Sequence, residues 1–187
     1  DDCGQSLDVL KPFLEIPAPI SFSVLTSAPL APGIAAYLQR RDRDVWAHVP
    51  MEPNTTSVMR GGGYLTTSMT DSDLARALAV NLTRVPGARG VNNHMGSRLT
   101  RDPRRMAVLV ELLAARGLYL IDSRTDSRTV ALDKAYEAGL PALSRDVFLD
   151  DAADPNTVEH NLGLLEKRAL EQGYALGIGH PRKETAE

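Results

Sequence analysis

The chain has 187 residues, a formal net charge of −3 and 43% hydrophobic residues, which is typical of a soluble globular protein with a full core. We therefore expect a single domain over residues 1–187. The acidic balance argues against general nucleic-acid binding, because neutralising phosphates requires clustered lysine and arginine. No apolar run has the length of a membrane helix, which argues against membrane insertion of this domain. The single cysteine, Cys3, excludes an internal disulfide and a thiolate zinc cluster.

Short β-branched runs alternate with longer helical patterns along the chain. Strands are predicted over residues 20–26, 44–51, 87–94, 118–122, 141–150 (with an exit loop) and 174–180. Helices are predicted over residues 33–41, 70–85, 102–117, 127–139 and 155–173. Thr70 or Asp71 caps the second helix, and Asp102 followed by Pro103 begins the third. Residues 54–67, which include three consecutive glycines, are predicted to form a long loop.

This alternation is typical of parallel strands joined by helical crossovers. The unbroken apolar runs fit strands that are buried on both faces. Two adjacent carboxylates, Asp1 and Asp2, open the chain, so we expect a first strand that is missing before residue 1. The glycine-rich run "GGGY" has neither the lysine nor the helix start of a phosphate-binding loop, and there is no dinucleotide-binding fingerprint.

Polar residues collect where the predicted strands end. They are Asp1, Asp2, His48, Glu52, Asn92, Asn93, His94, Asp122, Ser123, Arg124, Arg145, Asp146 and His180. The carboxyl ends of parallel strands converge on one face, where α/β proteins build their sites. The sequence therefore predicts one shared polar pocket. His160 lies inside an amphipathic helix among charged neighbours, and we interpret it as a surface residue.

The residue types in this set favour metal-assisted hydrolysis. A carboxylate with two imidazoles is a ligand set for zinc or another divalent ion with an open coordination position. A second carboxylate can accept a proton from water, and a separate histidine can protonate a leaving group. A single histidine at a strand end is more often a structural hydrogen-bonding residue, so the argument depends on the joint occurrence of these groups.

Six segments, taken together, resemble the divergent polysaccharide deacetylase family, a remote relative of the nodulation-type carbohydrate esterases. They are "DDCGQS", "HVPMEP", "GVNNHMGSRLT", "LYLIDSRT", "SRDVFLDD" and "IGHPRKET", and they span essentially the whole chain. The resemblance implies a deformed, incomplete (β/α) barrel with its site at the C-terminal ends of the strands. It also implies a strand that ends at Asp1 and Asp2, and export to the periplasm of a Gram-negative bacterium.

The resemblance also implies roles for individual residues. In the related esterases the first acid of an Asp-Asp pair is the base and the second binds the metal, which would be Asp1 and Asp2 here. Their histidine pair, four residues apart, reads His48 and Glu52 in this chain, so the second histidine is absent. The third ligand is then His94 or Glu52, and we favour His94 because an imidazole preserves the usual ligand set. Their final histidine corresponds to His180, the proton donor.

The arginine and tryptophan motifs that position substrate in those esterases have no clean counterparts here. We expect the substrate contacts to come from Glu52, Asn93, Asp122, Arg124, Arg145 and Asp146. Glycan-binding clefts usually expose aromatic side chains. Only Tyr64, in the glycine-rich loop, has a sequence context that predicts a free ring, since Trp46 lies in a predicted buried strand.

Three functions are compatible with these features. The leading hypothesis is a metal-dependent hydrolase, with zinc as the favoured ion, that deacetylates an N- or O-acetylated polysaccharide of the bacterial envelope. The alternative is a catalytically degenerate module that binds glycan or an envelope partner in the same pocket, motivated by the missing second histidine. A third possibility is an envelope protein in which Asp122–Arg124 and Arg145–Asp146 form a structural ion-pair network.

Overall fold

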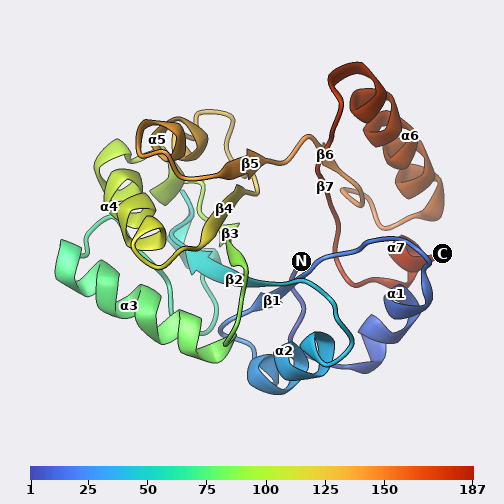
Figure 1. The fold of residues 1–187 in the computed structure, drawn as a ribbon, viewed down its shortest axis with the longest axis horizontal. Coiled ribbons are helices and arrows are strands. Elements are labelled where there is room, and N and C mark those ends of the chain that lie inside the picture. Colours follow the sequence, from blue (N-terminus) through green and yellow to red (C-terminus); the bar gives the residue numbers. More distant parts are fainter.

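The protein is described here by a computed structural model that covers residues 1–187. Its strands are β1 Phe22–Leu25, β2 Val45–Met51, β3 Gly90–Met95, β4 Tyr119–Asp122, β5 Ala142–Ser144, β6 Val147–Phe148 and β7 Gly177–Ile178. The first five form one parallel sheet in the order β1-β2-β3-β4-β5, and β6 pairs with β7 in a second parallel pair (Figure 1). Each strand of the main sheet therefore lies beside its neighbour in sequence.

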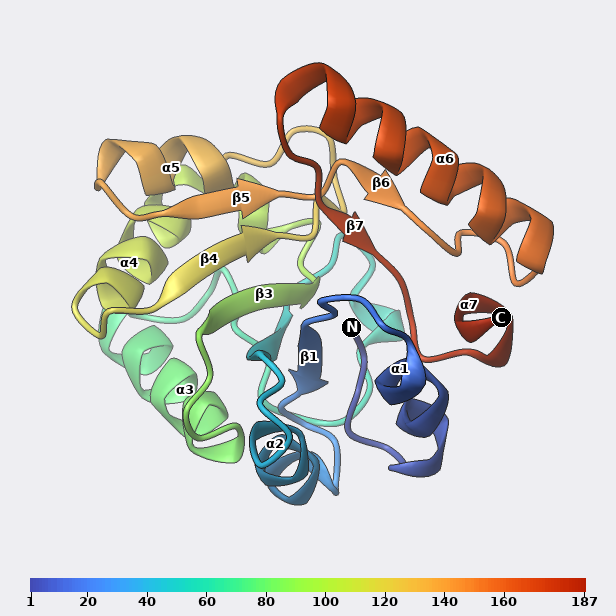
Figure 2. The same ribbon diagram turned by 45° about the vertical axis from the view of Figure 1, so that its right-hand side comes forward.

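Helices connect the strands and surround the sheet (Figure 2). The α-helices are α1 Lys11–Glu15, α2 Ala31–Gln39, α3 Asp71–Arg84, α4 Pro103–Ala114, α5 Ala131–Glu137, α6 Pro155–Gln172 and α7 Lys183–Ala186. Short 3-10 turns are η1 Asp8–Leu10, η2 Thr56–Val58 and η3 Leu99–Arg101. Helices α2 to α5 follow the outer face of the curved sheet, and α6 packs on β6.

A few backbone hydrogen bonds extend the sheet at both edges and bring it close to a closed barrel. On one side, Cys3 N donates to Ser23 O over 3.0 Å, and Asp1 N donates to Gly179 O over 2.5 Å. Residues 1–3 thus lie between β1 and the segment after β7. On the other side, Asp146 N donates to Leu176 O over 2.8 Å. The predicted deformed, incomplete (β/α) barrel is confirmed.

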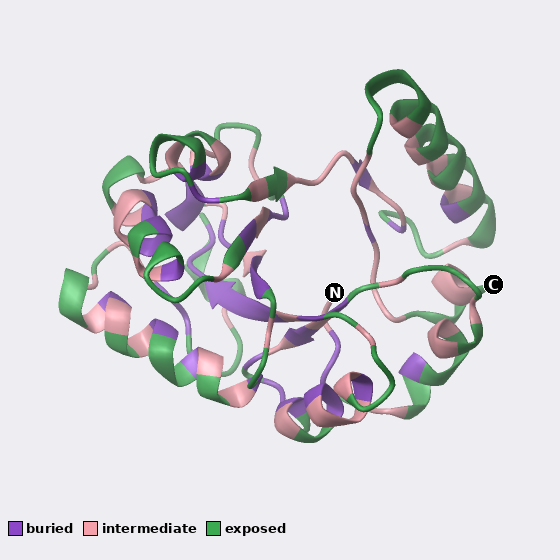
Figure 3. Cartoon of the chain, in the orientation of Figure 1, coloured by how far each residue is buried: buried purple, intermediate pink, exposed green.

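The central strands are largely buried (Figure 3), and their buried side chains form an apolar core. Val24, Ala47, Val49 and Val91 are fully buried. Helices α3 and α4 cover the outer face with leucines repeated every third or fourth position, which are also fully buried: Leu74, Leu78, Leu109 and Leu113. A parallel sheet covered on both faces requires apolar side chains of this kind in its central strands and on the helices that cover it.

Helix starts follow the expected capping chemistry. Thr70 Oγ1 accepts a hydrogen bond from Asp73 N over 3.1 Å, and Asp102 Oδ1 accepts from Arg104 N and Arg105 N over 3.0 Å each. Several predicted elements are longer than the observed ones, and the strand predicted over 141–150 divides into β5 and β6. Helix α5 begins only at Ala131, because residues 126–129 form a tight turn in which Asp126 Oδ1 accepts from Arg128 N. Of the strand predicted over 174–180, only Gly177–Ile178 pairs with β6.

Asn81 anchors the glycine-rich loop to the barrel. Its side-chain nitrogen donates to Gly63 O over 2.8 Å, and its side-chain oxygen accepts from the buried hydroxyl of Thr26. Replacing Asn81 with alanine is expected to lower the free energy of unfolding by about 1–3 kcal/mol, because buried polar groups lose their partners. Urea unfolding checks this, with Asn156→Ala, an exposed asparagine at the start of α6, as the control. Equal midpoints for the two variants would contradict the anchoring role.

Candidate metal centre and acid–base pair

The polar residues of three distant segments meet at the C-terminal ends of the central strands. Asp2 lies beside β1, His48 lies in β2 and His94 lies near the end of β3. In the parallel register, Leu25 is opposite His48 and Pro50 is opposite His94. The two histidines therefore rise from adjacent strands toward the same edge, where the segment 1–3 supplies the carboxylate.

One ligand atom from each of Asp2, His48 and His94 converges on a common point. Asp2 Oδ1 lies 2.8 Å from His94 Nδ1 and 3.2 Å from His48 Nε2, and the two imidazole nitrogens are 3.2 Å apart. In a tetrahedral zinc site with bonds of about 2.0–2.1 Å, neighbouring ligand atoms lie about 3.3 Å apart. The three residues fit one face of such a coordination shell and leave the fourth direction open.

Two buried atoms of this trio lack a hydrogen-bond partner of good geometry: Asp2 Oδ1 and His48 Nδ1. An unsatisfied buried polar group costs about 1–3 kcal/mol. The short distances around Asp2 Oδ1 thus come from converging lone pairs rather than from a satisfied network. A cation among the three ligand atoms would satisfy Asp2 Oδ1, which supports a fit between the residues and a metal ion.

The protonation states also suit metal binding. Burial lowers the pKa of His48 to about 4, although Asp2 acts in the opposite direction. Burial raises the pKa of Asp2, but the close imidazoles of His48 and His94 outweigh it and hold that pKa well below its usual range. At neutral pH, His48 is therefore neutral and Asp2 is ionised, which are the forms that bind divalent ions.

Asp1 and His180 form a second group that adjoins the trio. His180 Nε2 lies 3.5 Å from Asp1 Oδ1 and 3.6 Å from Asp2 Oδ2. The Asp1 side chain is almost fully buried, and its Oδ1 accepts no hydrogen bond. Asp1 Oδ2 lies 3.7 Å from His48 Nε2. A carboxylate and an imidazole thus lie beside the three converging ligand atoms, as an acid–base pair would require.

The sequence of the whole chain, including the residues of this centre, identifies its family. The sequence model of the divergent polysaccharide deacetylase family matches residues 1–187. The chain belongs to that family.

Two relatives match almost the whole length of this chain, and both are uncharacterized proteins. An uncharacterized protein of Haemophilus influenzae is 34% identical over 186 residues, which cover 99% of this chain and 66% of the relative. The uncharacterized protein YibQ of Escherichia coli is 30% identical over 185 residues, which cover 99% of this chain and 58% of the relative. The chain therefore spans about two thirds or less of these relatives.

A crystal structure shares the fold. The uncharacterized protein ATU2773 from Agrobacterium tumefaciens superposes with a TM-score of 0.92 at 18% sequence identity, over 98% of this chain and 76% of that chain. At this identity the likeness concerns the fold alone. Within this deacetylase-family chain, no helix combines the length and hydrophobicity that a membrane crossing requires.

Asp150 is a site residue of this family member that the sequence reasoning missed. Its Oδ1 lies 3.0 Å from His180 Nδ1, and its Oδ2 accepts hydrogen bonds from His180 N over 2.7 Å and Thr185 Oγ1 over 2.8 Å. The buried carboxylate therefore fixes the imidazole ring with Nε2 directed at Asp1 and Asp2. Asp150 follows β6 directly, so the criterion that selected the other strand-end acids applies to it as well.

Replacing Asp150 with asparagine is expected to make folding less sensitive to acid. Burial raises the pKa of Asp150, but hydrogen bonds from His180 and Thr185 lower it to about 2. The native state thus gains stability above the unfolded pKa, and loses it as the pH falls through the native pKa. Between about pH 6 and pH 2 the wild type should lose about 2 kcal/mol that the variant does not lose. Urea unfolding at both pH values measures the difference.

The neighbouring exposed acid offers a matched control for this measurement. Asp151→Asn should retain the acid sensitivity of the wild type, because Asp151 is exposed and contacts neither His180 nor Thr185. Identical pH dependence for the Asp150 and Asp151 variants would show that the Asp150–His180 pair does not stabilise the native state.

Strained backbone positions occur beside the centre, at Asp2 and Met95, and in the loop after β4, at Arg124. Asp2, Met95 and Arg124 have φ values of 55°, 55° and 54°, in the left-handed region that non-glycine residues rarely adopt. Hydrogen bonds hold one of these turns, since Met95 O accepts from Asn93 Nδ2 over 2.6 Å and from Thr125 Oγ1 over 3.0 Å. The chain thereby turns sharply just after His94, and such strain is common at functional sites.

Glu52 and Asn93 have structural partners at these strand ends. Glu52 is buried, and its Oε2 accepts from Thr67 N over 2.6 Å and from Thr67 Oγ1 over 2.8 Å. Arg98 lies 3.4 Å from the other carboxylate oxygen. Asn93 donates to Met95 O and accepts from Ser123 N over 2.8 Å. Both side chains thus secure loops, and their expected role in substrate binding stays a prediction.

Neither expected ion pair of the structural alternative is present. Asp122 Oδ1 accepts from the backbone nitrogen of Arg124 over 2.8 Å, and the Asp146 carboxylate accepts from Leu176 N over 2.8 Å. Arg145 donates to the carbonyl oxygens of Ser123 and Arg124 over 2.8 and 3.0 Å. The Asp122–Arg124 and Arg145–Asp146 pairs of the third possibility therefore do not form: backbone groups bind these side chains, and the carboxylate of Asp146 lies 3.6 Å from Arg168 instead.

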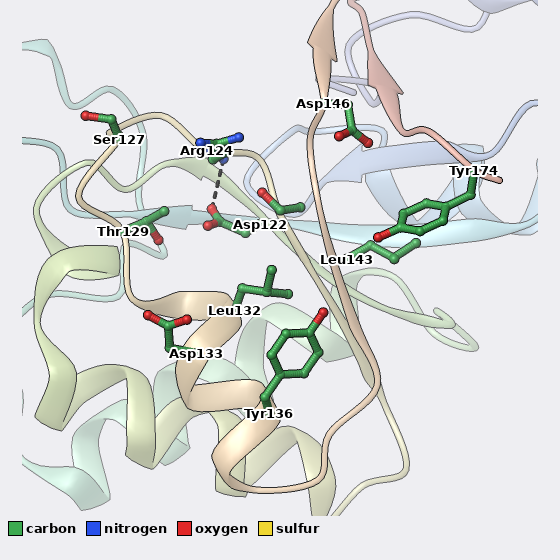
Figure 4. Close-up of a pocket in the computed structure, with 11 residues that line it drawn as sticks. Asp122, Arg124, Ser127, Thr129, Leu132, Asp133, Tyr136, Leu143, Asp146 and Tyr174 are labelled. Carbon is green, nitrogen blue, oxygen red and sulfur yellow. Dashed lines mark hydrogen bonds between the residues drawn. The ribbon is translucent and has the colours of Figure 1, made fainter. Parts of the chain in front are cut away.

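Asp122, Arg124 and Asp146 line a separate cavity that includes none of the centre's histidines (Figure 4). The prediction that Tyr64 presents a free ring is also wrong. Tyr64 is buried, and its hydroxyl accepts a hydrogen bond from Arg60 N over 3.2 Å. The glycine-rich loop folds back along β2, where Leu65 N donates to Pro50 O over 2.9 Å and brings the neighbouring ring into the interior.

Proposed function

We propose that this domain is a metal-dependent hydrolase that removes acetyl groups from a polysaccharide. The observation that carries the proposal is the convergence of Asp2 Oδ1, His48 Nε2 and His94 Nδ1 within 3.2 Å of one another. Membership of a deacetylase family and the adjoining Asp1–His180 pair support the same reaction class.

In this proposal Asp2, His48 and His94 hold the divalent ion. Imidazole and carboxylate donors in a site with an open direction are the usual ligands of zinc, so zinc is the favoured ion. When bound, such an ion supplies the Lewis acidity that polarises an acyl carbonyl and makes water a better nucleophile at neutral pH. The burial that keeps His48 neutral keeps its Nε2 lone pair available for this role.

The remaining groups move protons in this proposal. Asp1 accepts a proton from the attacking water, since its buried Oδ1 has no competing hydrogen bond. His180 Nε2 donates a proton to the departing amine or alcohol, and Asp150 holds the ring in place and stabilises its protonated form. The His180 ring therefore has a fixed orientation before substrate binds, and the buried Asp1 carboxylate stays free to accept a proton.

The substrate proposed here is an acetylated glycan of the bacterial envelope, acted on in the periplasm. The family description supports a polysaccharide, and resemblance to exported esterases supports the compartment. Asp122, Arg124, Arg145 and Asp146 stay candidates for contacts to the polymer.

Metal analysis and acetate release test this function together. Purified full-length protein should hold about one divalent ion per chain and release acetate from N-acetylated chitooligosaccharides or peptidoglycan fragments. Asp2→Ala should abolish both properties. A protein without any ion, in which Asp2→Ala changes nothing, would refute the hydrolase. Glycan binding in an ion-free centre without turnover would instead support the catalytically degenerate binding module.

A further inference from the structure

A second cavity lies between α5, β5 and the segment that follows α6. It encloses about 340 Å³, a size at the lower end of small-ligand sites. Two tyrosines lie on its rim, with Tyr136 on α5 and Tyr174 after α6 (Figure 4). Their exposed fractions are 62% and 56%, so both rings are available to a ligand. Leu132 and Leu143 add apolar surface between them.

A buried carboxylate oxygen without a partner lines this cavity. Asp122 is 1% exposed, and its Oδ1 accepts from Arg124 N, but its Oδ2 has no hydrogen-bond partner. Burial accordingly raises the pKa of Asp122. An orphaned buried acceptor is costly to the protein alone and favours a ligand that brings a hydrogen-bond donor.

Acidic groups outnumber basic ones in the lining. Asp122, Asp133 and Asp146 face one arginine, Arg124. Asp133 is exposed and has no ion-pair partner, whereas Asp146 lies 3.6 Å from Arg168. Arg145 also lies at the rim, so the acids that remain unpaired are Asp133 and the Oδ2 of Asp122, and these two favour a ligand with a positively charged donor. Aromatic faces such as those of the two tyrosines attract cations as well as the apolar faces of sugar rings.

We propose that this cavity binds an amino-sugar ring that carries a free, protonated amine, as in a deacetylated unit of a glycan. The proposal rests on the proposed function, which supplies the polymer and produces such amines. The tyrosines would stack on the ring, Asp122 Oδ2 would accept from the ammonium group, and the hydroxyls of Ser127 and Ser144 would meet the sugar hydroxyls. The cavity thus selects the product of deacetylation over the acetylated sugar.

Two side-chain contacts link the rim of this amino-sugar cavity to His180 beside the candidate metal centre. Arg145 donates to the carbonyl oxygens of Ser123 and Arg124 at the cavity rim, and its guanidinium lies 5.0 Å from the centroid of the Phe148 ring. The Phe148 ring in turn packs edge-on against His180, with centroids 5.3 Å apart. One polymer could therefore place an acetylated unit at the centre while an earlier product unit occupies the cavity.

Calorimetric titration at about pH 6 tests the proposal without any turnover. The probes are the glucosamine tetramer and the N-acetylglucosamine tetramer, each titrated into the chelator-treated full-length protein. We expect the glucosamine tetramer to bind about tenfold more tightly, because it offers a charge-assisted hydrogen bond to Asp122. Tyr136→Ala and Tyr174→Ala should each weaken its binding by about two- to tenfold. Asp122→Asn, which can still accept from Arg124 N, should remove the preference for the amine.

Two controls separate this cavity from the rest of the surface and from the centre. Tyr119→Ala removes an exposed tyrosine that does not line the cavity, and it should bind as the wild type does. His94→Ala should also leave this binding unchanged. Equal affinity for both tetramers, or wild-type binding by both tyrosine variants, would overturn the proposal. Loss of binding in His94→Ala would place the sugar at the centre instead. Absent acetate release with this binding pattern intact would refute the hydrolase alone.

Discussion

Replacing His94 with alanine is expected to remove the bound divalent ion and to lower acetate release by about 10³-fold or more, because Lewis-acid stabilisation is worth several kcal/mol. The substitution deletes one of three converging ligand atoms and leaves only Asp2 Oδ1 and His48 Nε2, which are 3.2 Å apart. Metal content after dialysis and initial rates of acetate release measure the two effects. They should fall together, since both depend on the same imidazole.

The chain offers a matched control in His160, an exposed histidine on α6. His160→Ala should retain the ion and the full rate of acetate release. A His94→Ala variant that still holds one ion per chain would show that the ion is bound elsewhere, and the proposed ligand set would fail. Rescue of His94→Ala by added imidazole would further indicate that the missing ring acts as a ligand.

Asp1→Asn is expected to keep the ion but to lower the rate of acetate release by about 10²- to 10⁴-fold, the usual contribution of a general base. An amide of the same shape fills the buried position but accepts no proton at neutral pH. Asp1 lies outside the trio of ligand atoms and nearer to His180, with 3.5 Å between Asp1 Oδ1 and His180 Nε2. Rates across a pH series, with metal content measured on the same samples, separate proton transfer from metal binding.

Comparing Asp1→Asn with Asp2→Ala distinguishes the roles of these two adjacent acids. Loss of the ion from Asp1→Asn in proportion to the loss of rate would identify Asp1 as a ligand rather than a base. An unchanged rate would exclude Asp1 from the proton transfer altogether. In both cases the fold should be intact, because the backbone of residues 1–3 provides the hydrogen bonds to β1 and to Gly179.

The meeting of Asp2, His48 and His94 could be predicted because it depends on topology alone. Parallel strands in sequential order place their carboxyl ends at one edge, whichever side chains they carry. The alternation of apolar runs and helical periods reveals that topology. Caps such as Thr70 and Asp102 could be assigned for a similar reason, since a helix start satisfies its backbone nitrogens with the nearest side-chain oxygen.

Side-chain contacts within the loops could not be predicted in the same way. The sequence suggests ion pairs for Asp122 and Asp146, but both carboxylates accept from backbone nitrogens whose positions depend on the loop path. Whether Tyr64, Tyr136 and Tyr174 are buried or exposed also depends on the path of the chain around them. The glycine-rich loop returns along β2 and buries Tyr64, whereas helix α5 presents Tyr136 to solvent. Periodicity describes the face of an element but not the course of a connection.

The hydrogen bonds of residues 1–3 with β1 and with Gly179 have a consequence for the order in which the fold forms. Asp1 N pairs with Gly179 O, which is 178 positions away, and the bond is made beside the metal centre. Contacts between such distant positions form late, because a large loop must close first. A chain folded only through β5 would contain Asp2, His48 and His94 but neither Gly179 nor His180. The proposed proton donor would then join the ligand trio only when β7 docks, and an ion held by Asp2, His48 and His94 would stabilise the pairing of residues 1–3 with the sheet.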